Sequence, residues 1–304
     1  MDDRSASLRL RALVVTCVLA AAVIIGIGGW PGQNGERPIA RLAERLAEFT
    51  RGLRPDGRYR APTSAERETA SRGFASLFVG ANVWLATSRL TPLGFSIDHE
   101  IDEATGRPYL LIMNEPDSER AWGMYMVDLS AAVRLAIEVP HPNSDLKTEQ
   151  MGLELFRLVP GSILMIAGAH RDAAGKAADV AHRRDSMFHV MATGFAGRGL
   201  PQVQLHGFSD ATLPARDLVI STSTGQAGEV AEHTALQLER AGLAVCLAWR
   251  EKCGKLGGTR NAQGQTAAAF DSPYLHVEAS RSVREDAGRR AAVIEAIAAV
   301  LLLR

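Results

Sequence analysis

The second half of the chain alternates strand-like and helix-like segments, and this alternation limits the fold more than any other feature. Short apolar segments typical of buried strands are followed by longer segments with helical spacing of their apolar residues. Strands are expected at 162–167, 203–205, 218–221, 244–249 and 274–279, and helices at 185–195, 230–241 and 284–303. The pattern predicts an α/β fold with a mixed central sheet, a mainly parallel later part and helices on both faces.

The segment before this alternation predicts an antiparallel start to the same sheet. Residues 95–101 alternate apolar and polar side chains, 107–114 are apolar, and the turn sequence Glu103-Ala104-Thr105-Gly106 lies between them. Two such segments around a short turn are typical of a β-hairpin. Two further strands are expected at 121–127 and 133–139.

The composition is that of an ordinary globular protein. The chain has 304 residues, of which 46% are hydrophobic, and its 34 basic residues balance 34 acidic ones. This length is sufficient for a sizeable core. The balanced charge, together with the lack of a basic tract interleaved with aromatic residues, argues against a nucleic-acid partner. The sequence does not indicate an oligomeric state.

The N-terminus has a different character. Arg4, Arg9 and Arg11 precede residues 12–30, which contain no charged side chain. A basic start followed by an apolar segment is typical of a signal peptide or a single membrane anchor. We expect an anchor at 1–30 with the rest of the protein outside the cytoplasm, or a secreted form. A linker and helical lead-in is expected at 31–92, with helical spacing at 39–53 and 64–89, and the α/β domain at 93–304.

Cys246 and Cys253 lie seven residues apart in a chain that is expected to be exported. Disulfides persist in oxidising compartments, so a local bridge between these two residues is expected. A zinc–thiolate site is disfavoured, because these are only two thiols and they do not form a Cys-x-x-Cys motif.

The apolar strand expected before residue 140 ends at His141, which has a proline on each side. The two prolines favour extended geometry and end the strand. Ser144 or Asp145 is a suitable N-cap for a helix over 146–156, in which Asp145 and Glu149 would share one face. A histidine with nearby carboxylates at a strand-to-helix turn is typical of a divalent-cation site. The alternative is a polar loop followed by a capped helix.

Three later strands carry polar residues of the same kind. His206 is followed by glycine at an expected strand end, and His170-Arg171 ends another strand. In the last strand, alternation places Glu278 on the same face as His276. A carboxylate within a strand that otherwise looks buried is costly unless it is paired, bound to metal or used in catalysis.

The order His141, nearby carboxylate, His206, Glu278 resembles the zinc carboxypeptidase superfamily, a group with a phosphorylase/hydrolase-like α/β fold. That superfamily has a histidine with a near carboxylate, a distant histidine and a catalytic glutamate on a late strand. Within it, the phage-type poly-γ-glutamate hydrolases and related amidohydrolases are most similar, because they share a Thr/Ser-Glu beyond the first ligands and a Glu-x-Ser strand followed by Arg. The resemblance covers roughly 96–304.

The resemblance implies a Zn²⁺ ion held by His141, His206 and one acid. The peptidases use His-x-x-Glu, whereas this chain has Ser144 at that position and its first acid one residue later. The second ligand therefore stays open between Asp145 and Glu149, with Asp145 preferred and Glu149 as a residue that supports the ligands. No Asn-Arg pair matches the peptidase carboxylate clamp, which argues against carboxypeptidase specificity.

The resemblance also implies a mechanism in which the metal activates water and Glu278 acts as the general base. Arg171, Arg281 and Arg284 follow strand ends and are candidates to bind the oxyanion and an acidic substrate. Candidates for the substrate pocket are His170, Asp179, His182 and Asn261.

Together these features predict an exported or membrane-anchored zinc-dependent amidohydrolase or peptidase. Its substrate would be a small peptide-like or acidic amide, such as a γ-glutamyl peptide. Two alternatives are open: a non-catalytic extracytoplasmic binding domain that retains the fold, and a metal-dependent esterase or deacetylase. Zinc content separates the binding domain from the enzymes.

Overall fold

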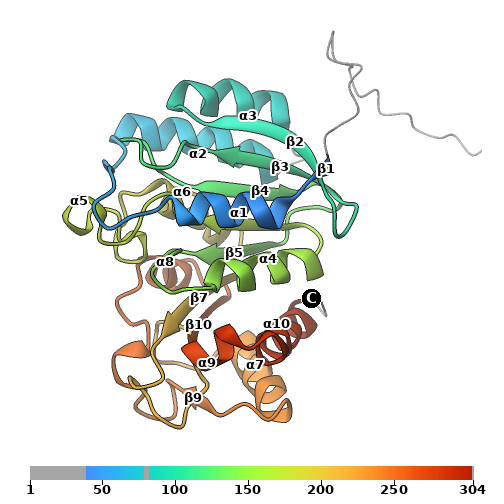
Figure 1. The fold of residues 1–304 in the computed structure, drawn as a ribbon, viewed down its shortest axis with the longest axis vertical. Helices are drawn as coiled ribbons and strands as arrows, with labels where there is room; N and C mark the ends of the chain where they lie inside the picture. Colours follow the sequence, from blue (N-terminus) through green and yellow to red (C-terminus); the bar gives the residue numbers. More distant parts are fainter. Residues whose placement is uncertain (1–38, 79–81, 303–304) are drawn as a thin grey trace, which may run out of the picture. The chain divides into compact units, whose positions relative to one another are not determined.

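A ten-stranded mixed β-sheet runs through the described residues, 39–78 and 82–302, of this computed structural model (Figure 1). The strands lie in the order β1-β2-β3-β4-β6-β5-β7-β10-β8-β9. Their bounds are β1 Ile39–Ala40, β2 Ser96–Asp102, β3 Pro108–Met113, β4 Met124–Asp128, β5 Leu135–Val139, β6 Ser162–Ile166, β7 Gln202–Phe208, β8 Leu218–Ser221, β9 Val245–Leu247 and β10 Tyr274–Ser280.

The strand directions divide the sheet into two parts. From β2 through β3 and β4 to β6 each neighbouring pair is antiparallel, whereas β6, β5, β7 and β10 run parallel to one another. At the far edge, β8 is antiparallel to β10 and parallel to β9. The predicted mixed sheet with an antiparallel start and a mainly parallel remainder is confirmed.

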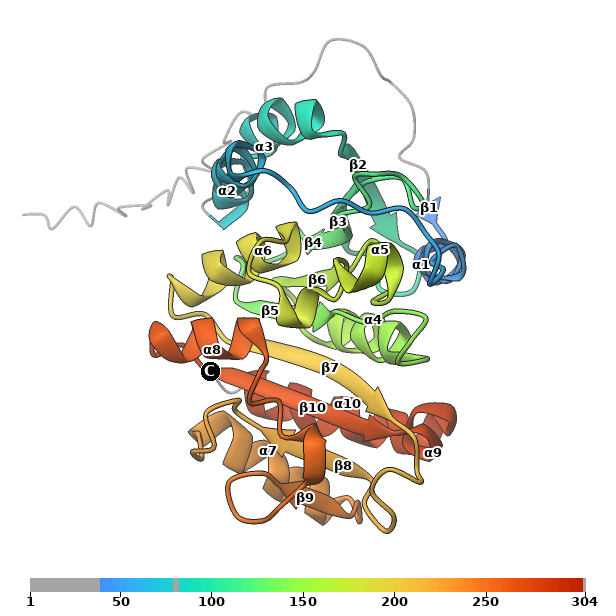
Figure 2. The ribbon, with the colours of Figure 1, turned by 90° about the vertical axis from the view of Figure 1, so that its left-hand side faces the viewer.

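Helices cover both faces of the sheet (Figures 1 and 2). Helices α1, α4, α7 and α10 share one apolar cluster with the strands, and α2, α3 and α6 share the cluster on the opposite face. Their bounds are α1 Leu42–Arg51, α2 Ser64–Phe78, α3 Val83–Leu90, α4 Thr148–Leu158, α5 Ala173–Lys176, α6 Met187–Ala196, α7 Glu229–Arg240, α8 Ala262–Ala269, α9 Arg281–Glu285 and α10 Ala287–Leu302. The predicted arrangement with helices on both faces is therefore confirmed.

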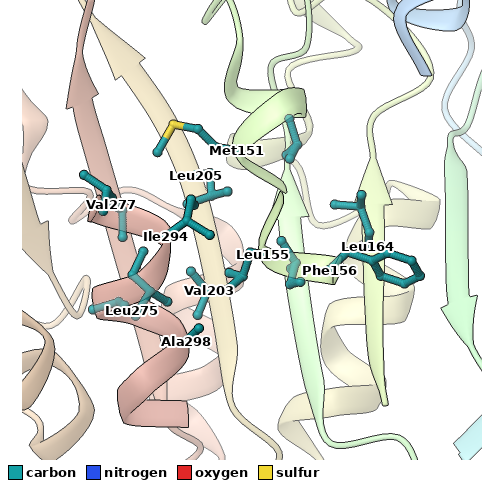
Figure 3. Close-up of a cluster of buried hydrophobic side chains, with 14 of the residues drawn as sticks. Met151, Leu155, Phe156, Leu164, Val203, Leu205, Leu275, Val277, Ile294 and Ala298 are labelled. Carbon is teal, nitrogen blue, oxygen red and sulfur yellow. The ribbon is translucent and has the colours of Figure 1, made fainter. Parts of the chain in front are cut away.

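The parallel strands β5, β7 and β10 have one apolar face. Val203, Leu205, Leu275 and Val277 are completely buried and belong to the cluster that contains the inner faces of α4 and α10 (Figure 3). Removing this apolar surface from water is the main stabilising contribution of the region.

The opposite face of the same three strands is polar. Side chains alternate across a strand, so the residues between these apolar ones point to the other side of the sheet. Glu138 of β5 lies beside Gln204 of β7, which lies beside His276 of β10, and His206 lies beside Glu278. Helices α6 and α8 contact these strands. His206 and Glu278 of this polar row are part of the candidate site.

The helix after His141 differs from the prediction. Helix α4 begins at Thr148, directly after Lys147, which has a left-handed backbone (φ 69°) and provides no side-chain cap. Asp145 lies outside the helix, and its backbone carbonyl accepts a hydrogen bond from the Thr148 amide at 3.2 Å. The predictions that Ser144 or Asp145 is the N-cap and that Asp145 shares a helical face with Glu149 are therefore wrong.

Other element boundaries also differ from those predicted. Strand β7 continues to Phe208, so His206 lies within the strand and not at its end. Strand β9 ends at Leu247, before the predicted end at 249. The predicted final helix is divided into α9 and α10 at Asp286, whose backbone is extended (φ −86°, ψ 118°).

The described residues all lie in one compact unit. The helices of the predicted lead-in contribute buried side chains to the two main apolar clusters of this unit. The predicted anchor at 1–30 lies outside the described residues. Within the described ranges, no helix has the length and apolarity to cross a lipid bilayer.

Candidate metal centre

His141, Asp145 and His206 come together at the carboxyl-terminal side of β5 and within β7. All three are buried, with exposed fractions of 2%, 8% and 5%. The Oδ2 atom of Asp145 lies 3.2 Å from Nδ1 of His141 and 3.2 Å from Nδ1 of His206. The two imidazole rings are 4.8 Å apart, centre to centre. A tight turn makes this possible, because the Asp145 amide donates to the His141 carbonyl at 2.9 Å.

The outer ring nitrogens of both histidines are held by other side chains. Nε2 of His141 is 2.7 Å from Oδ1 of Asp179, and Nε2 of His206 is 2.6 Å from Oε1 of Gln204. Histidines that bind metals usually donate the other ring N–H to a carboxylate or carbonyl oxygen in this way. The two Nδ1 atoms are thereby left facing the same carboxylate oxygen.

These three residues fit a divalent cation. With metal–nitrogen distances of about 2.0–2.1 Å, two ligands of one tetrahedral ion are about 3.3 Å apart. The observed 3.2 Å separations between Asp145 Oδ2 and each Nδ1 are close to that value. Among the described residues, His141, Asp145 and His206 are one of two groups of three whose ligand atoms all lie within 4.8 Å.

The surroundings of the two histidines shift their pKa values in opposite directions. Burial would raise the pKa of Asp145, but the hydrogen bond and charge of His141 lower it well below its usual range. Burial opposes a charge on His141, yet its bonds to Asp145 and Asp179 raise the pKa of this histidine. Burial lowers the pKa of His206 to about 4. Neutral His206 is thus ready to act as a ligand at neutral pH.

Glu278 and His276 of β10 lie next to His206. The three side chains form the second group whose ligand atoms lie within 4.8 Å, again among the described residues. Burial and the charge of Asp145 raise the pKa of Glu278 well above its usual range. The His276 ring is 4.8 Å from the His206 ring. Gly258, with φ of 62°, allows its backbone to approach the His276 ring, where an added Cβ would be only 3.0 Å away.

The three predicted arginines have different surroundings. Arg171 lies at the site: its NH1 is 3.1 Å from His141 Nδ1, and its NH2 donates to Asp179 at 3.2 Å. Arg281 is exposed and pairs with Glu285 at 2.8 Å. Of the three, Arg171 alone makes a hydrogen bond to the histidine–carboxylate group.

Arg284 is buried and donates to three backbone carbonyls. These belong to Ala279 at 3.1 Å, Phe208 at 3.0 Å and Leu146. A Cβ on Gly207 would overlap the guanidinium, so a larger residue there would displace Arg284. Arg284 therefore joins the ends of β7 and β10 to the loop that carries Asp145.

The remaining predicted site residues lie around this centre. Glu149 is half-buried in α4, burial raises its pKa, and it is in neither group of close ligand atoms. His170 is buried, and its Nδ1 accepts from the Asp172 amide at 3.2 Å. His182 is exposed, and its Nδ1 lies 3.1 Å from Oδ2 of Asp179. Burial would raise the pKa of Asp179, but hydrogen bonds from His141 and His182 lower it.

Asn261 is buried at the start of α8, and its side-chain amide forms hydrogen bonds with other residues of the protein. Its side chain caps the helix by accepting from the Gly264 amide at 3.0 Å, and it also accepts from the Tyr274 hydroxyl at 3.0 Å. Cys246 and Cys253 form a disulfide, with their Cα atoms 6.0 Å apart. The bridge precedes the loop that leads to Gly258 and Asn261.

Sequence reasoning missed three residues at this site: Glu138, Gln204 and His276. Glu138 is a charged residue in the apolar segment 135–139, which is the same signal that identified Glu278. Gln204 is two positions before His206, and alternation places them on one face. His276 was used only to indicate the face of Glu278.

No family model matches the chain, and no curated protein matches it. Solved structures do match it, at low sequence identity. A metallo-carboxypeptidase from Burkholderia cenocepacia is 12% identical with a TM-score of 0.38, and the match covers 80% of this chain and 69% of that one. A bacteriophage poly-gamma-glutamate hydrolase is 16% identical with a TM-score of 0.32, and the match covers 55% and 82%.

A third matching structure is the tripeptide-bound cell shape determinant protein Csd4 from Helicobacter pylori. It is 11% identical with a TM-score of 0.38, and the match covers 57% of this chain and 52% of that one.

Proposed function

We propose that this protein is a zinc-dependent hydrolase that cleaves an amide bond in a peptide-like or γ-glutamyl substrate. The observation that carries the proposal is the convergence of His141 Nδ1, His206 Nδ1 and Asp145 Oδ2 next to Glu278. Two imidazoles and one carboxylate are typical protein ligands of catalytic zinc and leave a position open. Bound there, zinc supplies a Lewis acid that lowers the pKa of water and polarises a carbonyl group.

The residues around the ligands have distinct roles in this proposal. Asp179 holds the outer nitrogen of His141 at 2.7 Å and so keeps that ring oriented. Glu278 accepts a proton from the attacking water and returns it to the leaving amine, because its carboxylate lies within 4.8 Å of the His206 ligand atom. Arg171 stabilises the negative charge that develops on the carbonyl oxygen, since it is the cation next to the ligand group.

Elemental analysis of the purified full-length chain tests the metal. We expect about one zinc ion per chain for the wild type and for Glu278→Gln, and none for His141→Ala or His206→Ala. His233→Ala is the matched control, because His233 is an exposed histidine on α7. Zinc retained at full occupancy in both ligand variants would contradict the proposed site.

Hydrolysis assays test the reaction class. Glu278→Gln is expected to lower the rate by about 10²–10⁴-fold while the zinc content stays unchanged. The substrates are poly-γ-glutamate, a short γ-glutamyl peptide, an ordinary α-linked peptide, an acetylated glycan and a simple ester. Cleavage confined to the ester or the acetylated glycan would replace amide hydrolysis with esterase or deacetylase activity.

One observation favours a second candidate, a non-catalytic binding domain. The Arg171 guanidinium lies 3.1 Å from His141 Nδ1 and 3.9 Å from Asp145 Oδ1, so a cation from the protein itself is close to the ligand atoms. A protein that uses Arg171 in this way would bind no zinc. The elemental analysis therefore separates the two candidates, and Arg171→Ala should lower activity in the enzyme without removing the metal.

We further propose that residues 1–30 anchor the protein in the cell membrane with the hydrolase domain outside the cytoplasm. The disulfide between Cys246 and Cys253 supports this location, because such bonds persist in oxidising compartments. Fractionation of cells that express the full-length chain should place it in the membrane fraction, accessible to protease added outside the cytoplasm. Protection from that protease in intact spheroplasts would contradict the proposed location.

A further inference from the structure

A buried carboxyl group lies on the polar face of the sheet beneath the metal centre. Glu138 of β5 has no exposed surface, and burial raises its pKa to about 8. A carboxyl group at such a position is costly unless its oxygens receive hydrogen bonds. Both do: Nε2 of Gln204 donates to Oε2 at 2.7 Å, and the Gln202 amide, in the orientation that satisfies both its atoms, donates to Oε1 at 2.9 Å.

Gln204 connects this carboxyl group to a metal ligand. Its Nε2 donates to Glu138 and, at 3.3 Å, to Gln263. Its Oε1 is 2.6 Å from Nε2 of His206 and also accepts from Nδ2 of Asn261. A glutamine side chain has two donor hydrogens and two acceptor lone pairs, so every position on this amide is occupied.

The orientation of the Gln204 amide is fixed from both ends. On one side, Nε2 of Gln204 lies 2.7 Å from Oε2 of Glu138, and an ionised Glu138 can only accept a hydrogen bond there. On the other side, Oδ1 of Asn261 already accepts hydrogen bonds from the Tyr274 hydroxyl and the Gly264 amide. Only the NH₂ group of Asn261 is therefore available for Gln204. With its NH₂ group toward Glu138, Gln204 presents an acceptor to His206.

We propose that Glu138 and Gln204 are positioning residues that hold His206 in the tautomer with hydrogen on Nε2, so that the Nδ1 lone pair is directed at the metal. This inference rests on the proposed metal site. The acceptor Oε1 of Gln204 requires a hydrogen on the His206 Nε2 atom. The neutral ring then has its lone pair on Nδ1, the atom that lies 3.2 Å from Asp145 Oδ2. Supporting contacts of this kind typically change metal affinity about 10–100-fold.

Exchanging the two side chains gives a direct test. In Glu138→Gln, the new NH₂ group must face another NH₂ group, from Gln202 or Gln204. If Gln204 turns its amide to relieve this, it presents NH₂ to His206 and favours the other tautomer. In Gln204→Glu, two carboxyl groups face each other. The double variant Glu138→Gln/Gln204→Glu restores a donor facing an acceptor and again presents an acceptor to His206.

Two measurements on the full-length chain report the outcome. Competition with a chromophoric chelator gives the affinity for Zn²⁺ alone, and we expect each single variant to bind about 10–100-fold more weakly. The double variant should recover most of that loss. The matched control is Gln226→Glu, the same substitution at an exposed position, which should not change the affinity. Nitrogen-15 NMR of the metal-free wild type should show His206 with its hydrogen on Nε2.

Each other result overturns a stated part of the proposal. Affinities of the single variants equal to the wild type, or a double variant as weak as the single ones, would remove the positioning role while leaving the zinc site intact. A wild type that binds no Zn²⁺ would remove the proposed function instead. His206 with its hydrogen on Nδ1 would overturn the inference even if no variant folds, because that measurement needs only the metal-free wild type.

Discussion

The two faces of β5, β7 and β10 are built from alternate residues of the same short segments, yet they have opposite characters. On one face, Leu205 and Val277 pack with α4 and α10 in a continuous apolar cluster (Figure 3). On the other, a polar row contains Gln204 and His206, which are buried, and Glu278, which is half-buried. The apolar face needs only volume and shape, which many side chains can supply. The polar face needs each donor opposite an acceptor, so a single change of atom type affects it.

This contrast predicts separate responses to mutation. Substitutions on the apolar face should change the free energy of unfolding and leave metal chemistry intact in the molecules that remain folded. Substitutions on the polar face should change metal chemistry more than stability. The predictions below test that separation.

The largest effect is expected at Asp145. Asp145→Ala should abolish both zinc binding and hydrolysis, because it removes the one carboxylate whose oxygen lies 3.2 Å from both histidines. Glu149→Ala is the matched control four residues away, and it should retain zinc and most of the activity. Elemental analysis and initial rates measure both. The reverse outcome would make Glu149 the ligand and overturn the assignment.

On the apolar face, Leu275→Ala should lower the free energy of unfolding by about 2–5 kcal/mol. Leu275 is completely buried, so the change removes apolar contact and leaves a cavity. Denaturant titration measures this loss. The zinc content and turnover rate of the folded fraction should match the wild type, and a parallel fall in zinc affinity would show that the two faces are not independent.

Helix α6, which contacts β5 and β7, should also make stability depend on pH. Burial lowers the pKa of His189 from 6.5 to about 4, so between these values the unfolded chain binds more protons than the folded one. This contribution is complete above pH 6.5 and is lost as the pH falls toward 4, which amounts to about 3 kcal/mol. His189→Gln should lack that part of the decline in unfolding titrations at several pH values. An unchanged decline would show that His189 is not charged on unfolding in this range.

The smallest effect is expected from the disulfide. Cys246→Ser/Cys253→Ser should lower the free energy of unfolding by about 2 kcal/mol, because the bridge closes a short loop in the unfolded chain. Zinc affinity should fall slightly, since the following loop carries Gly258 and Asn261 on the polar side. Thermal unfolding and chelator competition measure the two effects. A larger loss of zinc affinity than of stability would show that the loop itself supports the metal.

The sequence predicted the sheet and most of the residues that come together at the candidate metal centre, because both depend on local patterns. Alternation identified Glu278, and the prolines around His141 marked the end of β5. The choice between Asp145 and Glu149 could not be made, because it depends on where α4 begins. That start is set by the left-handed backbone of Lys147, a conformation uncommon for a residue other than glycine.

The supporting residues required information that no local pattern contains. Glu138 and Gln204 are adjacent only because β5 and β7 are neighbours in the sheet, although β6 lies between them in the chain. The contact between Asp179 and His141 likewise spans 38 residues of chain and depends on the loop after β6. Residue type alone would have flagged Glu138, since a charged group in an apolar strand needs a partner.

The three carbonyl contacts of Arg284 have a consequence for how the protein is made. Arg284 holds Leu146, next to Asp145, although 138 residues separate them along the chain. Synthesis proceeds from the N-terminus, so His141 and Asp145, two of the proposed ligands, leave the ribosome well before the arginine that fixes their loop. Nascent chains that end before α9 should therefore lack a formed metal site. Zinc would be acquired only after nearly the whole protein has been synthesised.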